Sequence, residues 1–359
     1  MSNRDYQFRN NKEGKRIFSF SKLMTFETCP YSYYLQYIKH IKGADSIYGI
    51  MGEQCHISAQ DLVEGKINND EALERFETAL EDSIDVLGLK FPTEKSGDNF
   101  KECMSEFLEH YKPHHDKYDI EKGFDVVMRD GKTLILGFID LIIYNEDGTI
   151  DVVDYKTSSK FSKKDFQHKK MQLLIYAKSL LEEGYKINRL YFNMMKYCTI
   201  SWDEINSKKQ LVHKSTMSER NGVGLKLKSV AKRLLKKQGL DENDIELRVD
   251  RMIETNTIDD LIADKFTISD YEIDVELSEA SLEEMEQWVE SIVNKTEELG
   301  KDEDNFKPIE IKKGSDFFCQ NLCGKGCKYF KEYSENDANS YKNRKKREKQ
   351  EDEDLDDLL

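Results

Sequence analysis

The sequence lacks the segments that would direct a chain into or across a membrane. The N-terminal residues MSNRDYQFRNNKEGKR contain no apolar stretch, and the longest apolar run, Leu134–Tyr144, holds Asp140 and is too short to span a bilayer. Seven cysteines, an odd number without a secretory signal, favour a reducing compartment. We therefore expect a cytoplasmic protein without a membrane partner.

Net positive charge is lacking as well, because 55 Lys and Arg stand against 70 Asp and Glu, which gives −15 over 359 residues. Hydrophobic residues still make up 38%, with 18 Phe and 18 Tyr, so the chain has the material for a packed core and wholesale disorder is excluded. Disorder is expected only at the ends, in the polar residues 1–16 and in the charged tail 336–359, which finishes EDEDLDDLL.

The periodicity of apolar residues changes along the chain. A helix is predicted from Phe18, with Ser19 or Ser21 as its N-cap, and a later helix from Ser162 to Gly184, where Asp165 completes a capping box. Between these two helices the pattern predicts three further helices, at 52–64, 69–88 and 98–112. Three antiparallel strands follow, at 124–130, 133–144 and 149–156. After Gly184 one more strand is predicted, at 189–197.

Asp140 and Asp154 stand on neighbouring predicted strands, with Asp147 midway between them in the turn Glu146-Asp147-Gly148. A three-residue loop with Gly148 in the left-handed region would place Asp140 directly opposite Asp154. A two-residue Asp-Gly turn would instead send the two carboxylates to opposite faces. The loop length therefore decides whether these residues can act together.

Two facing carboxylates among apolar residues require protonation or a counter-ion, and a hard divalent cation is the usual solution. The alternative is an ordinary solvent-exposed hairpin. Against that alternative, the charged face would also carry three aliphatic side chains, which are rare on a solvent face: Ile142, Ile150 and Val152.

Other polar residues fall near this pair. Lys156 follows Asp154 by two positions and shares its strand face, where its ammonium could hold a water or stabilise charge on a phosphate. Gln172 and Tyr176 are four residues apart on one helix face. His56, near the start of a predicted helix, is either a metal ligand that would bias the site toward manganese or a structural histidine.

A basic segment interrupts the acidic chain. Residues 208–237 hold ten basic residues and only one acid, Glu219, and the part VGLKLKSVAKRLLKKQG has amphipathic helical spacing. One face could contact phosphates, although a solvated helix face is the alternative. The candidate phosphate-binding residues are Lys226, Lys228, Lys232, Arg233, Lys236 and Lys237.

Four tyrosines near the N-terminus could stack on bases, but at helical spacing they are expected in the core: Tyr31, Tyr33, Tyr34 and Tyr37.

Several of these residues lie in motifs that resemble a known family. In sequence order the motifs are the opening helix with Cys-Pro-Tyr, then GEQCH ending at His56, GFID ending at Asp140, DYK at 154–156, and QLLIY at 172–176. The chain resembles the RecB-like branch of the PD-(D/E)XK nucleases, in particular the iron–sulfur members of the AddB type and the CRISPR spacer-acquisition nucleases.

The resemblance implies an α/β fold, with a mixed central sheet flanked by helices as in restriction endonucleases, helical insertions and a C-terminal cysteine-rich segment. It also implies hydrolysis of DNA with Mg²⁺ or Mn²⁺ held by His56, Asp140, Asp154 and the carbonyl of Tyr155. Lys156 would position the attacking water, and Gln172 and Tyr176 would support the site.

Cysteines divide into two groups. Cys55, Cys103 and Cys198 stand alone and are expected to be buried hydrophobes. The family resemblance implies that Cys29 joins a C-terminal trio, Cys319, Cys323 and Cys327, around a 4Fe-4S cluster. The C-x3-C-x3-C spacing of the trio departs from the family's C-x2-C-x5-C, so zinc is the alternative.

The implied nuclease domain covers 17–335, with a catalytic core at about 45–200, a basic insertion at about 205–240 and a cluster-closing segment at about 305–332.

We expect an exonuclease acting on DNA ends or single strands in replication, recombination or repair. A catalytically idle DNA-binding module and a CRISPR spacer-processing nuclease are the alternatives. Because no GxxxxGK[ST] motif is present, a helicase would be a separate chain. Such a helicase, or a single-strand-binding protein, could dock on the acidic tail.

Overall fold

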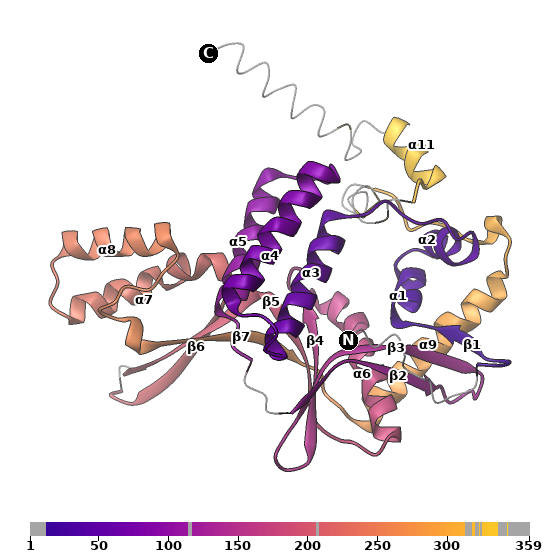
Figure 1. Ribbon diagram of the computed structural model, residues 1–359, viewed down its shortest axis with the longest axis horizontal. Coiled ribbons are helices and arrows are strands. Elements are labelled where there is room, and N and C mark those ends of the chain that lie inside the picture. Colours follow the sequence, from indigo (N-terminus) through magenta and orange to yellow (C-terminus); the bar gives the residue numbers. More distant parts are fainter. Residues whose placement is uncertain are drawn as a thin grey trace, which may run out of the picture.

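The computed structural model describes residues 12–113, 117–205, 208–312, 318–319, 323, 325–336 and 343. The chain is built around a mixed β-sheet with helices on both faces, and a helical pair stands at one end of it (Figure 1). Residues 1–11 and 344–359, on which most of the predicted terminal disorder falls, lie outside the described residues. No described helix is long and apolar enough to cross a membrane.

The first helix begins two residues later than predicted, because a short strand precedes it. Strand β1 (Arg16–Phe18) pairs in parallel with a later strand, and helix α1 (Phe20–Thr28) follows, with Ser19 as its N-cap. Cys29 ends α1 and begins α2 (Pro30–Tyr33), which passes into a π-helical turn, Tyr34–Ile38. The prediction that this tyrosine-rich segment is core is confirmed for Tyr31, Tyr33 and Tyr34, which are buried, while Tyr37 is half-buried and packs against the same core.

Three helices then form a layer over one face of the sheet. They are α3 (Ile47–Val63), α4 (Asn69–Glu81) and α5 (Glu94–His110). The predicted single helix over 69–88 is divided, because Asp82–Val86 continues α4 as a π-helical turn. This layer buries its apolar residues against the sheet in one cluster, which includes Cys55 and Cys103, the expected buried hydrophobes.

The predicted three-stranded antiparallel unit is confirmed. Strand β2 (Tyr118–Val127) pairs with β3 (Thr133–Tyr144), and β3 pairs with β4 (Thr149–Lys156). Asn145 and Thr149 still hydrogen-bond across the hairpin at 2.9 Å, so the loop between them is the three residues Glu146-Asp147-Gly148, with Gly148 at φ +82°. The paired residues include Ile142 opposite Val152 and Leu141 opposite Val153. The register is therefore the one that brings Asp140 and Asp154 together.

The face of this hairpin that carries the carboxylates is not a solvent face. Ile142, Ile150 and Val152 are essentially inaccessible and belong to the larger hydrophobic core. Helix α6 (Lys163–Glu182), capped by Ser162 and Asp165 as predicted, covers that core together with α1 and α9 (Glu279–Leu299). The alternative of an exposed hairpin is therefore wrong.

Strand β5 (Lys186–Ile205) runs parallel to β4 and is much longer than the strand predicted there. Its far half pairs with β6 (Leu211–Glu219). Strand β7 (Phe266–Asp274) pairs with both halves of β5, at 191–193 and again at 198–202. The sequence pattern revealed neither β6 nor β7. Helices α7 (Val223–Lys237) and α8 (Glu242–Thr255) pack on each other at the end of this extension (Figure 1). Within the described residues the sheet has seven strands.

Candidate functional site

Asp140 on β3 and Asp154 on β4 lie where the two strands meet, as the three-residue loop requires. Asp154 is 1% exposed, and the Asp140 carboxylate accepts a hydrogen bond from the main-chain N–H of Tyr155 at 2.9 Å. Burial raises the pKa of Asp140 well above its ordinary value, and the neighbouring Asp154 carboxylate raises it further. Two acids in one buried place repel each other, so this part of the structure favours a positive partner.

Lys156 supplies part of that positive charge. Its ammonium forms an ion pair with Asp154 and donates a hydrogen bond to Gln172 Oε1 at 3.0 Å. Gln172 Nε2 donates to the hydroxyl of Tyr176 at 2.6 Å, and that hydroxyl lies 3.4 Å from Asp154 Oδ1. The four residues thus form a closed chain of contacts between β4 and α6, which fixes the lysine beside the carboxylate.

His56 reaches the same place from α3. Its Nδ1 lies 3.5 Å from Asp140 Oδ2, and its ring packs edge-on against the ring of Tyr155, with centroids 6.0 Å apart. Burial lowers the pKa of His56 to about 4, so the imidazole is neutral at physiological pH. A Cβ on Gly52, one turn earlier, would lie 3.1 Å from Thr157 Oγ1, so glycine there lets α3 approach the end of β4 closely.

Acid should destabilise the metal-free protein through His56. The pKa of its imidazole is about 4 in the folded chain and about 6.5 when unfolded, so between these values the unfolded chain binds a proton that the folded chain does not. The free energy of unfolding should therefore fall as the pH drops from 6.5 toward 4. Melting temperatures measured in EDTA from pH 5 to 7 should show a shallower decline for His56→Gln. Parallel curves for the two proteins would contradict this reading.

Sequence reasoning missed two further polar residues that lie at this site. Glu121 on β2 occupies the register position opposite Asp140 and has φ +48°, which is rare for a residue other than glycine. Gln60 donates a hydrogen bond to Glu121 Oε1 at 2.8 Å. Because Gln60 follows His56 by one helical turn, its position could have been found from the i, i+4 spacing. The place of Glu121 follows only from the β2–β3 register.

The donor atoms present here are of the type that binds a hard cation, but they do not by themselves complete its coordination shell. Asp154 Oδ2 is buried, and its one partner among the described residues is the Lys156 ammonium. No three His, Cys, Asp or Glu side chains in the described part of the chain are grouped as a metal site. Carboxylate oxygens from Asp140 and Asp154, with a main-chain carbonyl, are the ligand types that Mg²⁺ and Mn²⁺ prefer.

The predicted cysteine ligands are brought partly together. Cys29 Sγ accepts a hydrogen bond from the N–H of Ser32 at 3.4 Å, and Cys323 Sγ donates to Ser32 Oγ at 3.6 Å. Burial raises the pKa of Cys327, and the Cys29 and Cys323 thiols add to the rise. Cys319 is half-buried. Cys29, Cys323 and Cys327 therefore share one neighbourhood around α2.

The predicted basic residues lie on α7, at the end of the β5–β7 extension. Two of them are neutralised by acids: Lys232 pairs with Glu246 of α8 and Arg233 with Glu204 of β5. Lys226, Lys236 and Lys237 are exposed and make no ion pair within the described residues. The basic segment is therefore shorter than the sequence indicated, because acids distant in sequence fold onto it.

Comparison with known proteins identifies the family. Residues 17–330 match the model of the PD-(D/E)XK nuclease superfamily, so the chain belongs to that superfamily. Its members are generally nucleases and typically use Mg²⁺ or Mn²⁺. None of the curated proteins matches this sequence. Among solved structures the chain is similar to one titled "Crystal structure of SSO0001", at 15% identity and a TM-score of 0.22 over 69% of this chain and 79% of that one.

Proposed function

We propose that this protein is a DNA nuclease of the RecB-like branch that hydrolyses phosphodiester bonds with Mg²⁺ or Mn²⁺. The observation that carries the proposal is the pair Asp140 and Asp154, the second of them buried, with Lys156 held against Asp154. A solitary buried carboxylate could be structural. A repelling pair that also anchors a lysine through Gln172 and Tyr176 is costly for stability and is typical of an active site.

Each residue has a part in this proposal. Asp140, Asp154, His56 and the Tyr155 carbonyl would hold the cation, which when bound would lower the pKa of a water and neutralise charge on the phosphate. The Tyr155 N–H already orients the Asp140 carboxylate. Lys156 would hold the attacking water, and Gln172 fixes its ammonium in place. Because the His56 imidazole is neutral, its nitrogen keeps a lone pair for the cation.

Glu121 enters the proposal as a residue that positions α3 through Gln60. Its carboxylate accepts the Gln60 amide on the helix face that carries His56. Replacement of Glu121 by leucine should lower nuclease activity by about 10- to 100-fold, because losing a group that supports a ligand costs that much. The same change should raise the Mg²⁺ concentration needed for half-maximal rate. Glu121→Gln, which keeps an acceptor for Gln60, should recover much of the activity, and equal activity in all three proteins would refute this role.

An exonuclease that works on ends or single strands in replication, recombination or repair is the specific form that we propose. Spacer processing in a CRISPR system is the alternative pathway. The complete set of Asp140, Asp154, Lys156 and Gln172 supports an enzyme over an idle binding module. Lys156 contacts both Asp154 and Gln172, and Asp140 accepts a hydrogen bond from the N–H of Tyr155, which stands between Asp154 and Lys156. A helicase or single-strand-binding protein remains the proposed partner of the acidic tail.

A 4Fe-4S cluster held by Cys29, Cys319, Cys323 and Cys327 is also part of the proposal, with zinc as the alternative. The shared contacts of Cys29 and Cys323 with Ser32 support it. Such a centre would tie α2 to the C-terminal segment across nearly the whole chain. Its role is structural in this proposal, because Cys29 and Cys323 contact Ser32 of α2 rather than the Asp140–Asp154 pair.

The exposed lysines of α7 are proposed to contact the DNA backbone. Reversing Lys226, Lys236 and Lys237 to glutamate should weaken binding to duplex DNA and reduce the slope of log K against log salt by about 0.9 for each phosphate that is no longer neutralised. The matched control reverses Lys295, Lys301 and Lys307, three exposed lysines near the end of α9, and changes net charge equally. If both triple variants bind alike, α7 is only a solvated helix face.

The test of the proposed function is degradation of end-labelled single- and double-stranded DNA by anaerobically purified protein. Mg²⁺ or Mn²⁺ should support cleavage and EDTA should stop it. Shortening from the labelled end would indicate exonuclease action, whereas internal fragments would contradict it. Failure to cut any DNA with either metal, by a folded protein that still binds DNA, would favour the idle module.

A further inference from the structure

One lysine lies on the side of α6 that packs against the sheet. Lys169 stands one helical turn before Leu173 and two turns before Tyr176, so the three residues share the sheet-facing stripe of that helix. Leu173 and Tyr176 are almost fully buried, and Lys169 is half-buried. Lysine is rare on the apolar stripe of a helix, because burial of its ammonium costs free energy. This position therefore favours a partner of opposite charge.

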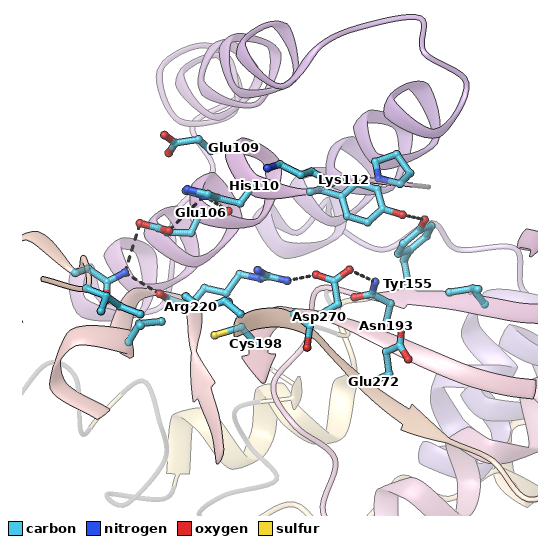
Figure 2. A pocket seen from close by; sticks show the side chains of 18 of the residues that line it. Glu106, Glu109, His110, Lys112, Tyr155, Asn193, Cys198, Arg220, Asp270 and Glu272 are labelled. Carbon is cyan, nitrogen blue, oxygen red and sulfur yellow. Dashed lines mark hydrogen bonds and ion pairs between the residues drawn. The ribbon is translucent and has the colours of Figure 1, made fainter. Parts of the chain in front are cut away.

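The face of the sheet that Lys169 approaches is the one that carries the proposed active site. Alternation along β4 directs Lys156 toward α6, where its ammonium donates to Gln172. Tyr155, the preceding residue, points the other way, into a cavity of about 1040 Å³ that Arg220 also lines (Figure 2). Because Lys169 precedes Gln172 by three residues on α6, it stands beside the contact of Lys156 with Gln172 and away from the cavity.

The electrostatic neighbours of Lys169 agree with this position. Burial lowers its pKa, the Lys156 ammonium lowers it further, and the carboxylates of Asp154 and Asp165 only partly offset both. Its ammonium forms no ion pair or hydrogen bond with any residue that the structure describes. Both acids are already engaged, because Asp154 pairs with Lys156 and Asp165 accepts from the Ser162 hydroxyl at the helix cap.

The other partly buried lysines of α6 do have acidic partners. Lys170, the next residue, pairs with Glu284 of α9 at 2.6 Å, and Lys178 pairs with Glu286 of the same helix at 3.1 Å. A half-buried cation without such a partner lowers the stability of the fold, and a negatively charged ligand would remove that penalty. Lys169 is also partly accessible, as contact with a ligand requires.

We propose that Lys169 binds the DNA phosphate next to the one that is cut, beside the water that Lys156 would hold. Lys169 and Gln172, which fixes Lys156, are separated by about 4.5 Å of helical rise. That displacement is of the same order as the rise of about 3.4 Å per nucleotide along a DNA strand. Residues 157–168, which lead from β4 to Lys169, hold three further lysines and one acid, so the approach is basic. This contact rests on the proposed nuclease function and extends it to a second phosphate.

Equilibrium binding of a labelled single-stranded oligonucleotide in EDTA tests the contact without cleavage. Lys169→Met should bind about 10-fold more weakly at low salt, as the loss of a hydrogen bond to a charged group predicts. The slope of log K against log salt should fall by about 0.7, the value for one phosphate of a single strand. Lys170→Met is the matched control, since it removes the same charge from a lysine that Glu284 already neutralises. It should leave the slope unchanged, and Lys169→Arg should keep both the affinity and the slope.

Kinetics separate this role from that of Lys156. A contact to a neighbouring phosphate is made equally in the bound substrate and in the transition state, so Lys169→Met should raise KM about 10-fold and leave kcat nearly unchanged. Lys156→Met should instead lower kcat. In EDTA, Lys169→Met should melt at or above the temperature of the unmodified chain, because it removes an unpaired charge from a half-buried position. Melting several degrees lower would indicate a structural lysine and would overturn the proposal.

Failure of this contact and failure of the proposed function give different results. If Lys169→Met and Lys170→Met bind the oligonucleotide alike while the unmodified chain cuts DNA, only the role of Lys169 is refuted. If binding depends on Lys169 but no DNA is cut with Mg²⁺ or Mn²⁺, the phosphate contact is supported and the nuclease activity is refuted. An unmodified chain that does not bind the oligonucleotide at low salt would also overturn the contact.

Discussion

Asparagine in place of Asp140 is expected to slow DNA cleavage by about 100- to 1,000-fold while leaving the metal-free protein at least as stable as before. The amide keeps an oxygen to accept the Tyr155 N–H, so the strand geometry survives. It removes one of the two charged ligands proposed for the cation, and a loss of about 100- to 1,000-fold is the usual cost of removing one preorganised electrostatic contact. Steady-state cleavage of labelled DNA measures the effect.

The stability half of this prediction follows from the raised pKa of Asp140. A carboxyl whose pKa is higher in the folded chain than in the unfolded one destabilises the fold as pH rises through the shifted value. At neutral pH in EDTA, Asp140→Asn should therefore melt at or above the temperature of the unmodified protein. That advantage should vanish in acid below about pH 4, where the carboxyl is protonated in both states.

Added Mg²⁺ should reverse the order, because it would stabilise only the protein that binds it. Asp147→Asn is the control, since Asp147 is exposed in the turn of the same hairpin and asparagine can still accept from the Thr149 N–H. An Asp140→Asn protein that cuts DNA normally would remove the carboxylate pair from the mechanism. A variant that melts several degrees lower in EDTA would instead contradict the repulsion between the two acids.

Serine in place of Cys323 is expected to remove the visible colour, the bound metal and much of the stability together. Cys323 is buried against Ser32, which precedes it by 291 positions in sequence, and Ser32 also contacts Cys29. A centre that joins these segments closes a very long loop, and such a cross-link contributes on the order of 4 kcal/mol to the free energy of unfolding. Absorption spectra, iron and zinc analysis and denaturant unfolding measure the three effects.

Cys103→Ser is the matched control for that experiment. Cys103 is fully buried and hydrogen-bonds Asn221 Oδ1 at 3.2 Å, an acceptor that serine can also reach. It should keep its metal and lose little stability. Unchanged metal content and unfolding in Cys323→Ser would refute the proposed centre, and zinc in place of iron would support the alternative that the cysteine spacing leaves open.

The prediction of the hairpin succeeded because its information is local. The turn residues Glu146-Asp147-Gly148 set the loop length, the loop length sets the register, and the register decides which face Asp140 and Asp154 share. Capping by Ser19 and Ser162 was predictable for the same reason. Local patterns did not reveal β6 or β7, whose residues are half-exposed and carry little apolar alternation.

The charge on α7 shows where a one-dimensional pattern misleads. The sequence presents a continuous basic segment, but Glu204 and Glu246 approach it from β5 and α8 and neutralise part of it. Ion pairs between elements depend on packing, which sequence spacing does not encode. The cavity beside Arg220 was missed for the same reason, since α5, β5, β7 and α8 each supply part of its lining.

The sequence by itself determined the helices and the three antiparallel strands of the first half of the chain, helix α6, the hairpin register and the residue types of the site, because turn chemistry, capping and apolar periodicity act over a few residues. Only the tertiary structure decided that Glu121 stands opposite Asp140, that Gln60 reaches it from α3, and that Cys29 and Cys323 meet at Ser32. Those contacts join segments far apart in the chain, and they are fixed by how the helical layers pack on the sheet.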